Sequence, residues 1–121
     1  MADSGERRDF IRIRERLVLL LKNTATGRVH RTLTDDVSGS GLRLVTSELL
    51  EAGAEVEGEL KLPDRNEMIV FAGVVAWSRV VPDQKRKSYE PPLREIGLKF
   101  TRIEPNDQAL IQQHARLNAA S

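Results

Sequence analysis

Two short stretches of this 121-residue sequence carry side chains suited to binding a polar ligand. The first is the segment Arg7-Arg8-Asp9-Phe10-Ile11-Arg12, which places arginines at positions 7, 8 and 12. A guanidinium group can donate two parallel hydrogen bonds to a phosphate, a geometry that lysine cannot reproduce. Arg8 and Arg12 would share one face of a helix, whereas in an extended segment they converge only if the chain bends.

The second stretch is the turn Asp36-Val37-Ser38-Gly39-Ser40-Gly41, which joins two short apolar runs. Asp36 supplies an anionic acceptor, and the Ser38 hydroxyl can both donate and accept a hydrogen bond. Gly39 and Gly41 can adopt positive φ at little cost, or they can allow a ligand to approach the backbone closely. Taken alone, such a sequence is also typical of an Asx or Ser turn at the end of a strand, so its function depends on what lies beside it.

The overall composition is that of one globular domain with no strong charge. A net charge of +1 means that any anion site must be local, which disfavours a general nucleic-acid binder. The sequence contains no cysteine, which excludes disulfides and thiolate metal sites and suits a reducing cytoplasm. No apolar run approaches the roughly 20 residues that span a bilayer, and the first residues lack the apolar core of a signal peptide. We therefore expect a cytoplasmic protein with a flexible arm over residues 1–6 and a single domain over residues 7–121.

The residue pattern gives no indication of an enzyme. The two histidines, His30 and His114, do not have the spacing of metal ligands, and His114 is expected to be a structural residue on the apolar face of a helix. Ser38 and Ser40 lack the strand–turn–helix setting of a nucleophile, and no phosphate-binding loop ends in Gly-Lys-Ser/Thr. We expect no catalytic residue, no metal and no cofactor.

Alternating and β-branched residues predict six short strands, followed by one helix. The long apolar run over 68–81 is rich in β-branched residues, so it is expected to be a strand, with a bend or bulge at Gly73. The predicted strands cover residues 17–21, 28–35, 42–44, 55–62, 68–81 and 96–100. A helix that begins near Asn106 would carry an apolar stripe formed by Leu110, Ile111, His114 and Leu117. This pattern predicts a mainly β fold, a closed six-stranded antiparallel β-barrel with a C-terminal α-helix covering one mouth or face.

The order of these motifs resembles the PilZ domain, the bacterial receptor for cyclic di-GMP. The matching residues are RRDFIR (Arg7, Arg8 and Arg12) and DVSGSG (Asp36, Ser38 and Gly41). Supporting matches are GVVAW, around Gly73 and Trp77, and IGLKF before the predicted helix. Each motif is weak alone, but their combination and order are specific, and together they span nearly the whole chain. The resemblance implies the same six-stranded barrel with a terminal helix.

The resemblance further implies a binding site for cyclic di-GMP, whose two phosphodiesters and two guanines suit bidentate guanidinium contacts. Arg8 and Arg12 would hold guanine and phosphate from a flexible arm. Asp36 would accept hydrogen bonds from the amine edge of guanine. Ser38 would hydrogen-bond nearby, and Gly41 would leave room for the base.

Two further positions bear on this implied site. In the family, an arginine directly before the motif goes with a stacked pair of ligand molecules, so Arg7 favours two ligands per site. Trp77 either stacks on a base as a further contact or fills the core as a strand residue.

The run Lys85-Arg86-Lys87 is expected to be a solvated loop.

The resemblance implies a ligand-gated adaptor rather than an enzyme. An arm that folds over the ligand would expose a new surface to an unidentified effector protein of the motility, chemotaxis, pilus or exopolysaccharide machinery. No membrane insertion and no nucleic-acid polymer are expected. Two alternatives remain: an oligonucleotide-binding barrel, which an aromatic content of 4% disfavours, and a ligand-independent interaction module in which the motif persists as a turn.

Overall fold

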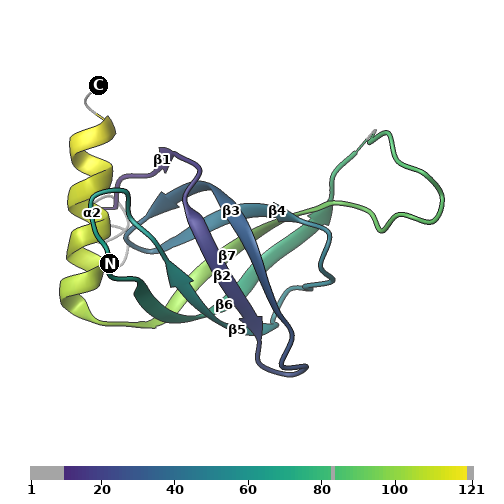
Figure 1. Cartoon of the computed structure of the whole chain (residues 1–121), viewed down its shortest axis with the longest axis horizontal. Coiled ribbons are helices and arrows are strands. Elements are labelled where there is room, and N and C mark those ends of the chain that lie inside the picture. Colours follow the sequence, from purple (N-terminus) through teal and green to yellow (C-terminus); the bar gives the residue numbers. More distant parts are fainter. Residues whose placement is uncertain (1–9, 83, 120–121) are drawn as a thin grey trace, which may run out of the picture.

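The computed structural model describes residues 10–82 and 84–119 of the chain. Strands dominate this part of the chain, and one long helix follows them (Figure 1). In chain order the elements are β1 (Ile13–Arg14), β2 (Val18–Asn23), β3 (Val29–Ser38), β4 (Gly41–Thr46), β5 (Glu55–Leu60), β6 (Ile69–Val80), β7 (Arg94–Ile103) and α2 (Pro105–Ala119).

Six of the strands close into an antiparallel barrel. The sheet order is β1-β3-β2-β5-β6-β7-β4, and an additional pairing of β3 with β4 joins the two ends. Within the described part of the chain, the short β1 lies outside this ring and pairs with the end of β3 alone. The closed barrel followed by a C-terminal helix confirms the predicted fold class. Closure pairs the strand edges that an open sheet would expose.

The barrel interior is filled by the alternating apolar residues of the strands. On β5, Val56 and Leu60 are buried, whereas the glutamates between them face solvent. Among the residues that are at most 2% exposed, the largest include Leu19, Leu21, Leu42, Leu44, Ile69, Ile96 and Ile111. One face of each strand therefore supplies the core, and the other face forms an outer wall that is free to carry a site.

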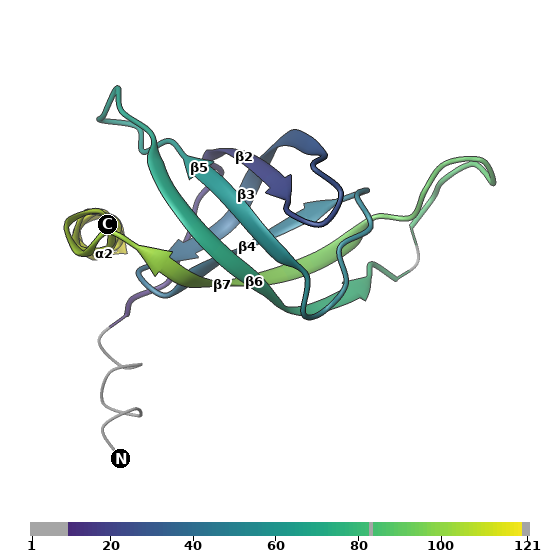
Figure 2. The same ribbon diagram turned by 90° about the horizontal axis from the view of Figure 1, so that it is seen from below.

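The helix α2 stands across one end of the barrel (Figures 1 and 2). The side chains of Ile111 and Ala115 in this helix are fully buried against the barrel. His114 Nε2 donates to Glu15 Oε1 at 2.6 Å, in agreement with a structural histidine. The predicted apolar stripe is wrong at Leu117, which is 66% exposed because Ala115 holds the buried position one turn beyond Ile111. Within the described residues, no helix is long and apolar enough to cross a membrane.

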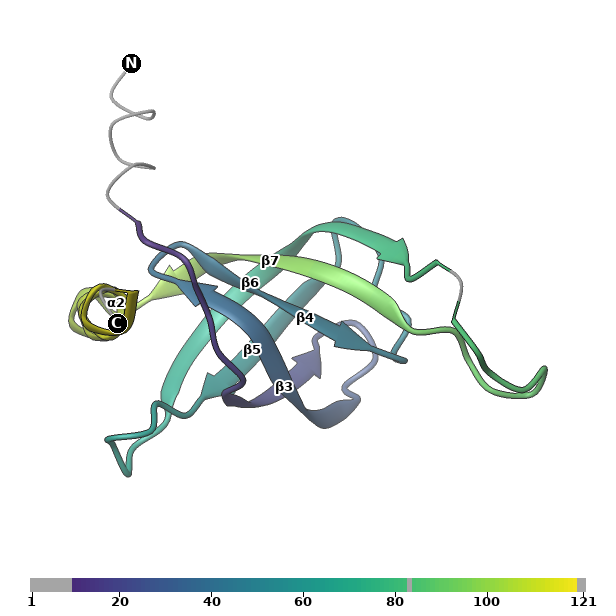
Figure 3. The same ribbon diagram turned by 90° about the horizontal axis from the view of Figure 1, so that it is seen from above.

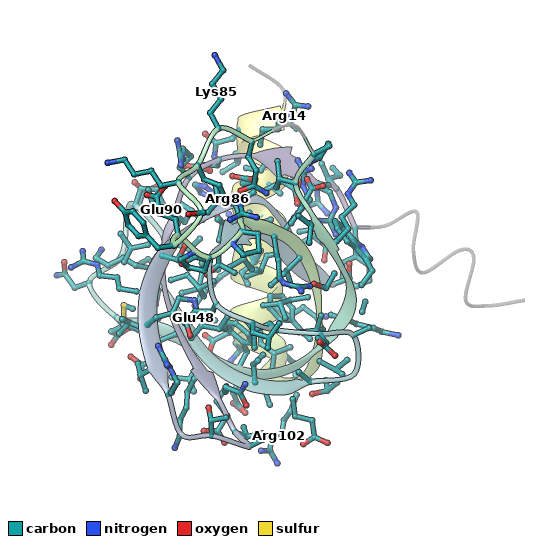
Figure 4. All side chains as sticks on the ribbon, turned by 90° about the vertical axis from the view of Figure 1, so that its right-hand side faces the viewer. Arg14, Glu48, Lys85, Arg86, Glu90 and Arg102 are labelled. Atoms are coloured by element: carbon teal, nitrogen blue, oxygen red, sulfur yellow. The ribbon has the colours of Figure 1, made fainter. Side chains whose placement is uncertain are left out.

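The loop between β6 and β7 extends from the opposite end of the barrel (Figures 1 and 4). Lys85 points away from the barrel, whereas Arg86 turns back and its Nη1 donates to the Glu90 carbonyl at 2.7 Å (Figure 4). Lys87 lies over the ring of Tyr89, at 5.8 Å from the ring centroid. The basic run is therefore an exposed loop, as the sequence predicts.

The partly buried His30 should make the stability of the barrel depend on pH. Burial lowers the pKa of His30, and the nearby Glu48 opposes this effect only in part. A histidine whose folded pKa lies below its unfolded value of about 6.5 stabilises the fold above that value, and this contribution is lost as the pH falls through the folded pKa. Urea unfolding at about pH 7.5 and about pH 5.5 should show that the wild type loses more stability on acidification than His30→Gln. Equal losses in the two proteins would contradict this assignment.

Candidate ligand-binding site

The segment before β2 is fixed to the barrel beside the predicted turn. The start of the described chain runs beside β3 (Figure 3). β1 pairs with β3 so that Ile13 lies opposite Val37 and Arg14 lies opposite Asp36. Between β1 and β2 the side chain of the buried Thr34 adds to the backbone bonds, because its Oγ1 donates to the Glu15 carbonyl at 2.7 Å and accepts from Leu17 N at 2.9 Å. These contacts hold the segment from which Arg12 reaches Asp36.

Replacing Thr34 with valine tests this connection. The change keeps the shape of the side chain but leaves the Glu15 carbonyl and the Leu17 amide without their partner. We expect a loss of about 2 kcal/mol in the free energy of unfolding, measured by urea titration. Thr34→Ser retains the hydroxyl and should lose clearly less. If the serine variant is as unstable as the valine variant, the methyl group and not the hydroxyl stabilises this junction.

A bulge in β3 turns Asp36 towards the outer wall. Thr34 lies opposite Leu44 and Asp36 opposite Arg43, so Asp35 is the additional residue. Strict alternation after Thr34 would have placed Asp36 inside the barrel and Val37 outside. The bulge reverses this, so that Val37 is fully buried in the core and Asp36 faces the arginines of the outer wall.

Asp36 lies between two arginines at the edge of a surface pocket. Arg12 Nη1 donates to Asp36 Oδ1 through a short contact, and Arg43 Nε donates to Asp36 Oδ2 at 2.8 Å. The Asp36 side chain is only 8% exposed, whereas that of Arg12 is 47% exposed. The pocket has a volume of about 510 Å³ and is lined by Arg12, Asp36, Ser40, Leu42, Arg43, Ala76, Trp77, Gly97, Leu98 and Lys99. A volume of this size suits a small organic ligand.

A second carboxylate extends the charged contacts away from Asp36. Arg43 Nη1 donates to Glu95 through a short contact, and Arg79 Nε donates to Glu95 Oε1 at 2.8 Å. The hydrogen bond from Arg79 is the main reason why the pKa of Glu95 is lowered, and the charges of both arginines add to it. Burial alone would lower the pKa of Arg43, but its contacts with Asp36 and Glu95 outweigh burial and raise it. Both groups therefore stay charged at neutral pH.

Trp77 lies on the outer wall, so the expectation that it could be a core residue is wrong. β6 and β7 shift register between Val75 and Trp77, which makes Ala76 an additional residue. This bulge turns Trp77 outward, and the side chain is 41% exposed. The indole lies on Gly97, where an added Cβ would come within 2.3 Å of Trp77 Nε1. Trp77 thus forms a wall of the same pocket that Asp36 lines.

The remaining turn residues have mainly internal contacts. Ser38 is 1% exposed, and its Oγ lies 3.0 Å from Ser40 Oγ and accepts from Ser40 N at 3.2 Å. At Gly41 an added Cβ would lie 2.0 Å from the Leu98 carbonyl oxygen, so glycine is required where β4 approaches β7. Among the glycines that the structure describes, Gly27 and Gly53 have positive φ, so the turn does not use left-handed backbone at Gly39 or Gly41.

The structure brings together part of the set predicted from the sequence. Arg12, Asp36 and Trp77 line one pocket, whereas Ser38 and Gly41 shape the turn beside it. Arg7 and Arg8 lie outside the described residues.

The pocket also contains side chains that the sequence prediction did not select, namely Ser40, Arg43 and Lys99. The alternation of Arg43 with Leu42 and Leu44 already places it on the outer face beside the turn. Lys99 follows the same rule, since it lies between the inward-facing Leu98 and Phe100.

Several solved structures share this fold. The chain superimposes on the Bacillus subtilis inhibitor of motility, MotI/DgrA, with a TM-score of 0.75 and 19% identity, covering 92% of this chain and 50% of that one. The PilZ domain of YcgR from Escherichia coli, solved with c-di-GMP, matches with a TM-score of 0.62 and 17% identity over 95% and 98% of the two chains. The Borreliella burgdorferi PlzA protein, in complex with c-di-GMP, matches with a TM-score of 0.56 and 9% identity over 99% and 58%.

These likenesses are at the level of the fold, since all three identities are below 20%. The chain spans half the length of MotI/DgrA and of the regulatory factor MrkH. No curated protein sequence matches it significantly. The sequence model of the PilZ domain, however, matches residues 6–116. With the barrel, the terminal helix and a sequence match over nearly its whole length, this chain belongs to the PilZ domain family.

Proposed function

We propose that this chain is a cyclic di-GMP receptor whose ligand binds in the pocket between Arg12, Asp36 and Trp77. The observation that carries the proposal is the placement of an arginine, a carboxylate and an indole around one pocket of about 510 Å³. A phosphate, the edge of a guanine and the face of a base each require one of these groups. Membership of the PilZ family supports the proposal, as do the YcgR and PlzA structures, both of which contain c-di-GMP.

Binding is proposed to involve an exchange of partners at Asp36. Arg12 occupies Asp36 Oδ1, and its departure would free this oxygen to accept from the N1–H and amine hydrogens of guanine together with Oδ2. Arg12 is 47% exposed and can swing towards a phosphodiester or the guanine O6/N7 edge, while Arg43 keeps Asp36 in place. In this proposal Arg8 supplies the second guanidinium. Ser38 and Gly41 contribute by fixing the turn from which Ser40 faces the ligand.

A second molecule of cyclic di-GMP is proposed to stack on the first. Arg7 supplies the additional guanidinium, and the partly exposed indole of Trp77 is the aromatic side chain in the lining of the pocket. Lys99, in the same lining, provides a further positive charge for the phosphates. Two ligands per chain are therefore the expected stoichiometry.

The ligand signal is proposed to leave the pocket through the segment that carries Arg12. The Phe10 ring packs on Gly39, where an added Cβ would lie 2.5 Å from the ring, and Glu15 bonds to His114 of α2. Gln108 of α2 also donates to the Gly39 carbonyl at 2.9 Å. Movement of Arg12 towards a ligand would strain these contacts and change the surface formed by the segment and α2. An effector protein that recognises this altered surface would make the chain an adaptor.

Isothermal titration of the full chain with cyclic di-GMP tests the proposal. We expect saturable binding with about two nucleotides per chain, and little heat from cyclic di-AMP, whose adenines lack the guanine donor pair. A single-stranded RNA of matched charge should bind weakly in comparison. The absence of heat with cyclic di-GMP would contradict the receptor proposal. Preferential binding of the RNA would favour an oligonucleotide-binding barrel instead.

A further inference from the structure

Five charged side chains of alternating sign form a continuous chain across the outer wall. We call this set the charge ladder; it consists of Arg12, Asp36, Arg43, Glu95 and Arg79. Each pair of consecutive residues in the ladder is joined by a direct hydrogen bond between their side chains. It runs from the segment before β1 across β3, β4 and β7 to β6. One ladder therefore connects the carboxylate of the pocket with the strand that carries its tryptophan.

Glu95 joins the last two arginines of the ladder, because its two oxygens serve different arginines. Oε2 accepts from Arg43 Nη1, and Oε1 accepts from Arg79 Nε at 2.8 Å. The Glu95 side chain is only 14% exposed, so water competes weakly for these contacts. A glutamine at this position would keep the shape but replace one acceptor oxygen with an NH2 donor and remove the charge, so the two guanidinium groups would no longer each have an acceptor oxygen of their own.

At one end of the ladder, Glu95 controls how Arg43 meets Asp36. Arg43 donates Nη1 to Glu95, which fixes the orientation of its guanidinium, and in this orientation Nε donates to a single oxygen, Asp36 Oδ2. The other oxygen, Oδ1, is left to the half-exposed Arg12. A guanidinium released from Glu95 can turn and take both carboxylate oxygens as a bidentate pair. Glu95 thereby keeps one oxygen of Asp36 open to exchange.

At the other end, Glu95 holds Arg79 over the indole of the pocket. Arg79 Cζ lies 5.6 Å from the centroid of the Trp77 ring, a distance typical of a cation–π contact. The indole in turn lies on Gly97, which pairs with Arg43 across β7 and β4. The same carboxylate thus fixes both the acceptor wall and the aromatic wall of the pocket.

We propose that Glu95 is a positioning residue that sets the selectivity of the pocket for guanine. This inference rests on the proposed function, because it concerns the recognition of cyclic di-GMP by Asp36. Guanine presents two neighbouring donors, N1–H and the 2-amine, which need both carboxylate oxygens, whereas hypoxanthine presents N1–H alone. By keeping Oδ1 exchangeable, Glu95 allows the 2-amine of guanine to contribute to the binding affinity.

The first arm of the test needs no nucleotide. Trp77 is the single tryptophan of the sequence, and Arg79 lies over its ring, so its fluorescence reports on the Arg79 end of the ladder. Glu95→Gln should change the Trp77 emission in the same direction and to the same extent as Arg79→Gln, and the double variant should show no further change. The control Glu67→Gln breaks the exposed Arg65–Glu67 pair outside the pocket and should leave the emission unchanged. Additive changes in the double variant would contradict the ladder.

The second arm compares cyclic di-GMP with cyclic di-IMP, the analogue that lacks both 2-amines. In the wild type the ratio of the two Kd values measures the contribution of the amine donors. Glu95→Gln should reduce this ratio by about fivefold, because Asp36 can no longer use both oxygens, and Glu67→Gln should leave it unchanged. A purely structural role would weaken both nucleotides equally and preserve the ratio. An unchanged ratio in a folded Glu95→Gln variant would overturn the proposal.

The two arms separate failure of this inference from failure of the proposed function. If the wild type binds neither nucleotide, the receptor proposal and the selectivity role fall together, while the fluorescence arm still decides whether Glu95 holds Arg79. If the wild type binds cyclic di-GMP and Glu95→Gln keeps both the Trp77 emission and the nucleotide ratio, the receptor proposal stands and the role of Glu95 is wrong.

Discussion

Replacing Arg12 with alanine is expected to weaken the binding of cyclic di-GMP by about 100-fold, because a bidentate guanidinium contact contributes roughly 1–3 kcal/mol. The fold should tolerate this change. Arg12 is half-exposed, and exposed ion pairs contribute at most about 1 kcal/mol to the free energy of unfolding. Isothermal titration and urea unfolding of the same preparation measure the two effects together.

Arg14→Ala is the matched control for this prediction. Arg14 lies two residues further along, is also exposed, and does not line the pocket. We expect its alanine variant to bind cyclic di-GMP within about twofold of the wild type, with any difference arising from the weak long-range effect of its charge. Equal losses for both variants would show that the arginines act through general charge and not through a specific contact.

Replacing Asp36 with alanine is expected to remove guanine recognition and also to destabilise the barrel. Binding of cyclic di-GMP should again fall by about 100-fold, since the acceptor for the guanine donors is lost. Unlike Arg12, Asp36 is almost buried and accepts from two arginines, so the free energy of unfolding should fall by about 2 kcal/mol. The same pair of measurements, titration and urea unfolding, checks both effects.

Two further variants separate the contributions at this position. Asp36→Asn keeps one acceptor oxygen for Arg43 and should recover part of the stability but not the binding of guanine. Asp35→Ala changes the neighbouring acid on the bulge, which does not line the pocket, and should bind nearly as the wild type does. If Asp36→Ala unfolds less easily than the wild type and still binds, the carboxylate has no role in the site.

The barrel and its closing helix could be predicted because their residues follow simple periodicities. The alternation of glutamates with buried residues on β5 specifies a half-exposed strand, and the β-branched run of β6 specifies a long one. The register shift beside Gly73 also agrees with the predicted bulge. On α2 the helical period correctly identifies Ile111 as buried, but it does not show where the buried face ends. The small Ala115 is buried there, whereas the predicted Leu117 is exposed.

The pocket was only partly predictable because it is built on interruptions of these periodicities. Asp36 and Trp77 face outward only through the bulges at Asp35 and Ala76, and neither bulge is marked by a glycine in the sequence. Alternation alone therefore favours a core position for Trp77. Glu95 could not be linked to Arg43 from the sequence, since their contact joins residues 52 positions apart. The resemblance of motifs identified Asp36, whereas the ladder required the three-dimensional structure.

An NMR titration of the isotope-labelled chain with cyclic di-GMP tests whether the ligand occupies this pocket. We expect the largest shifts at the Trp77 indole N–H, at the guanidinium signal of Arg12 and at the amides of Asp36 and Ser40, which surround the pocket. A second groove, of about 620 Å³, lies on the outer wall of β2, β5 and β6 and serves as an internal comparison. Shifts confined to Lys22, Glu57 and Val70 in that groove, with none at Trp77 and Asp36, would contradict the site.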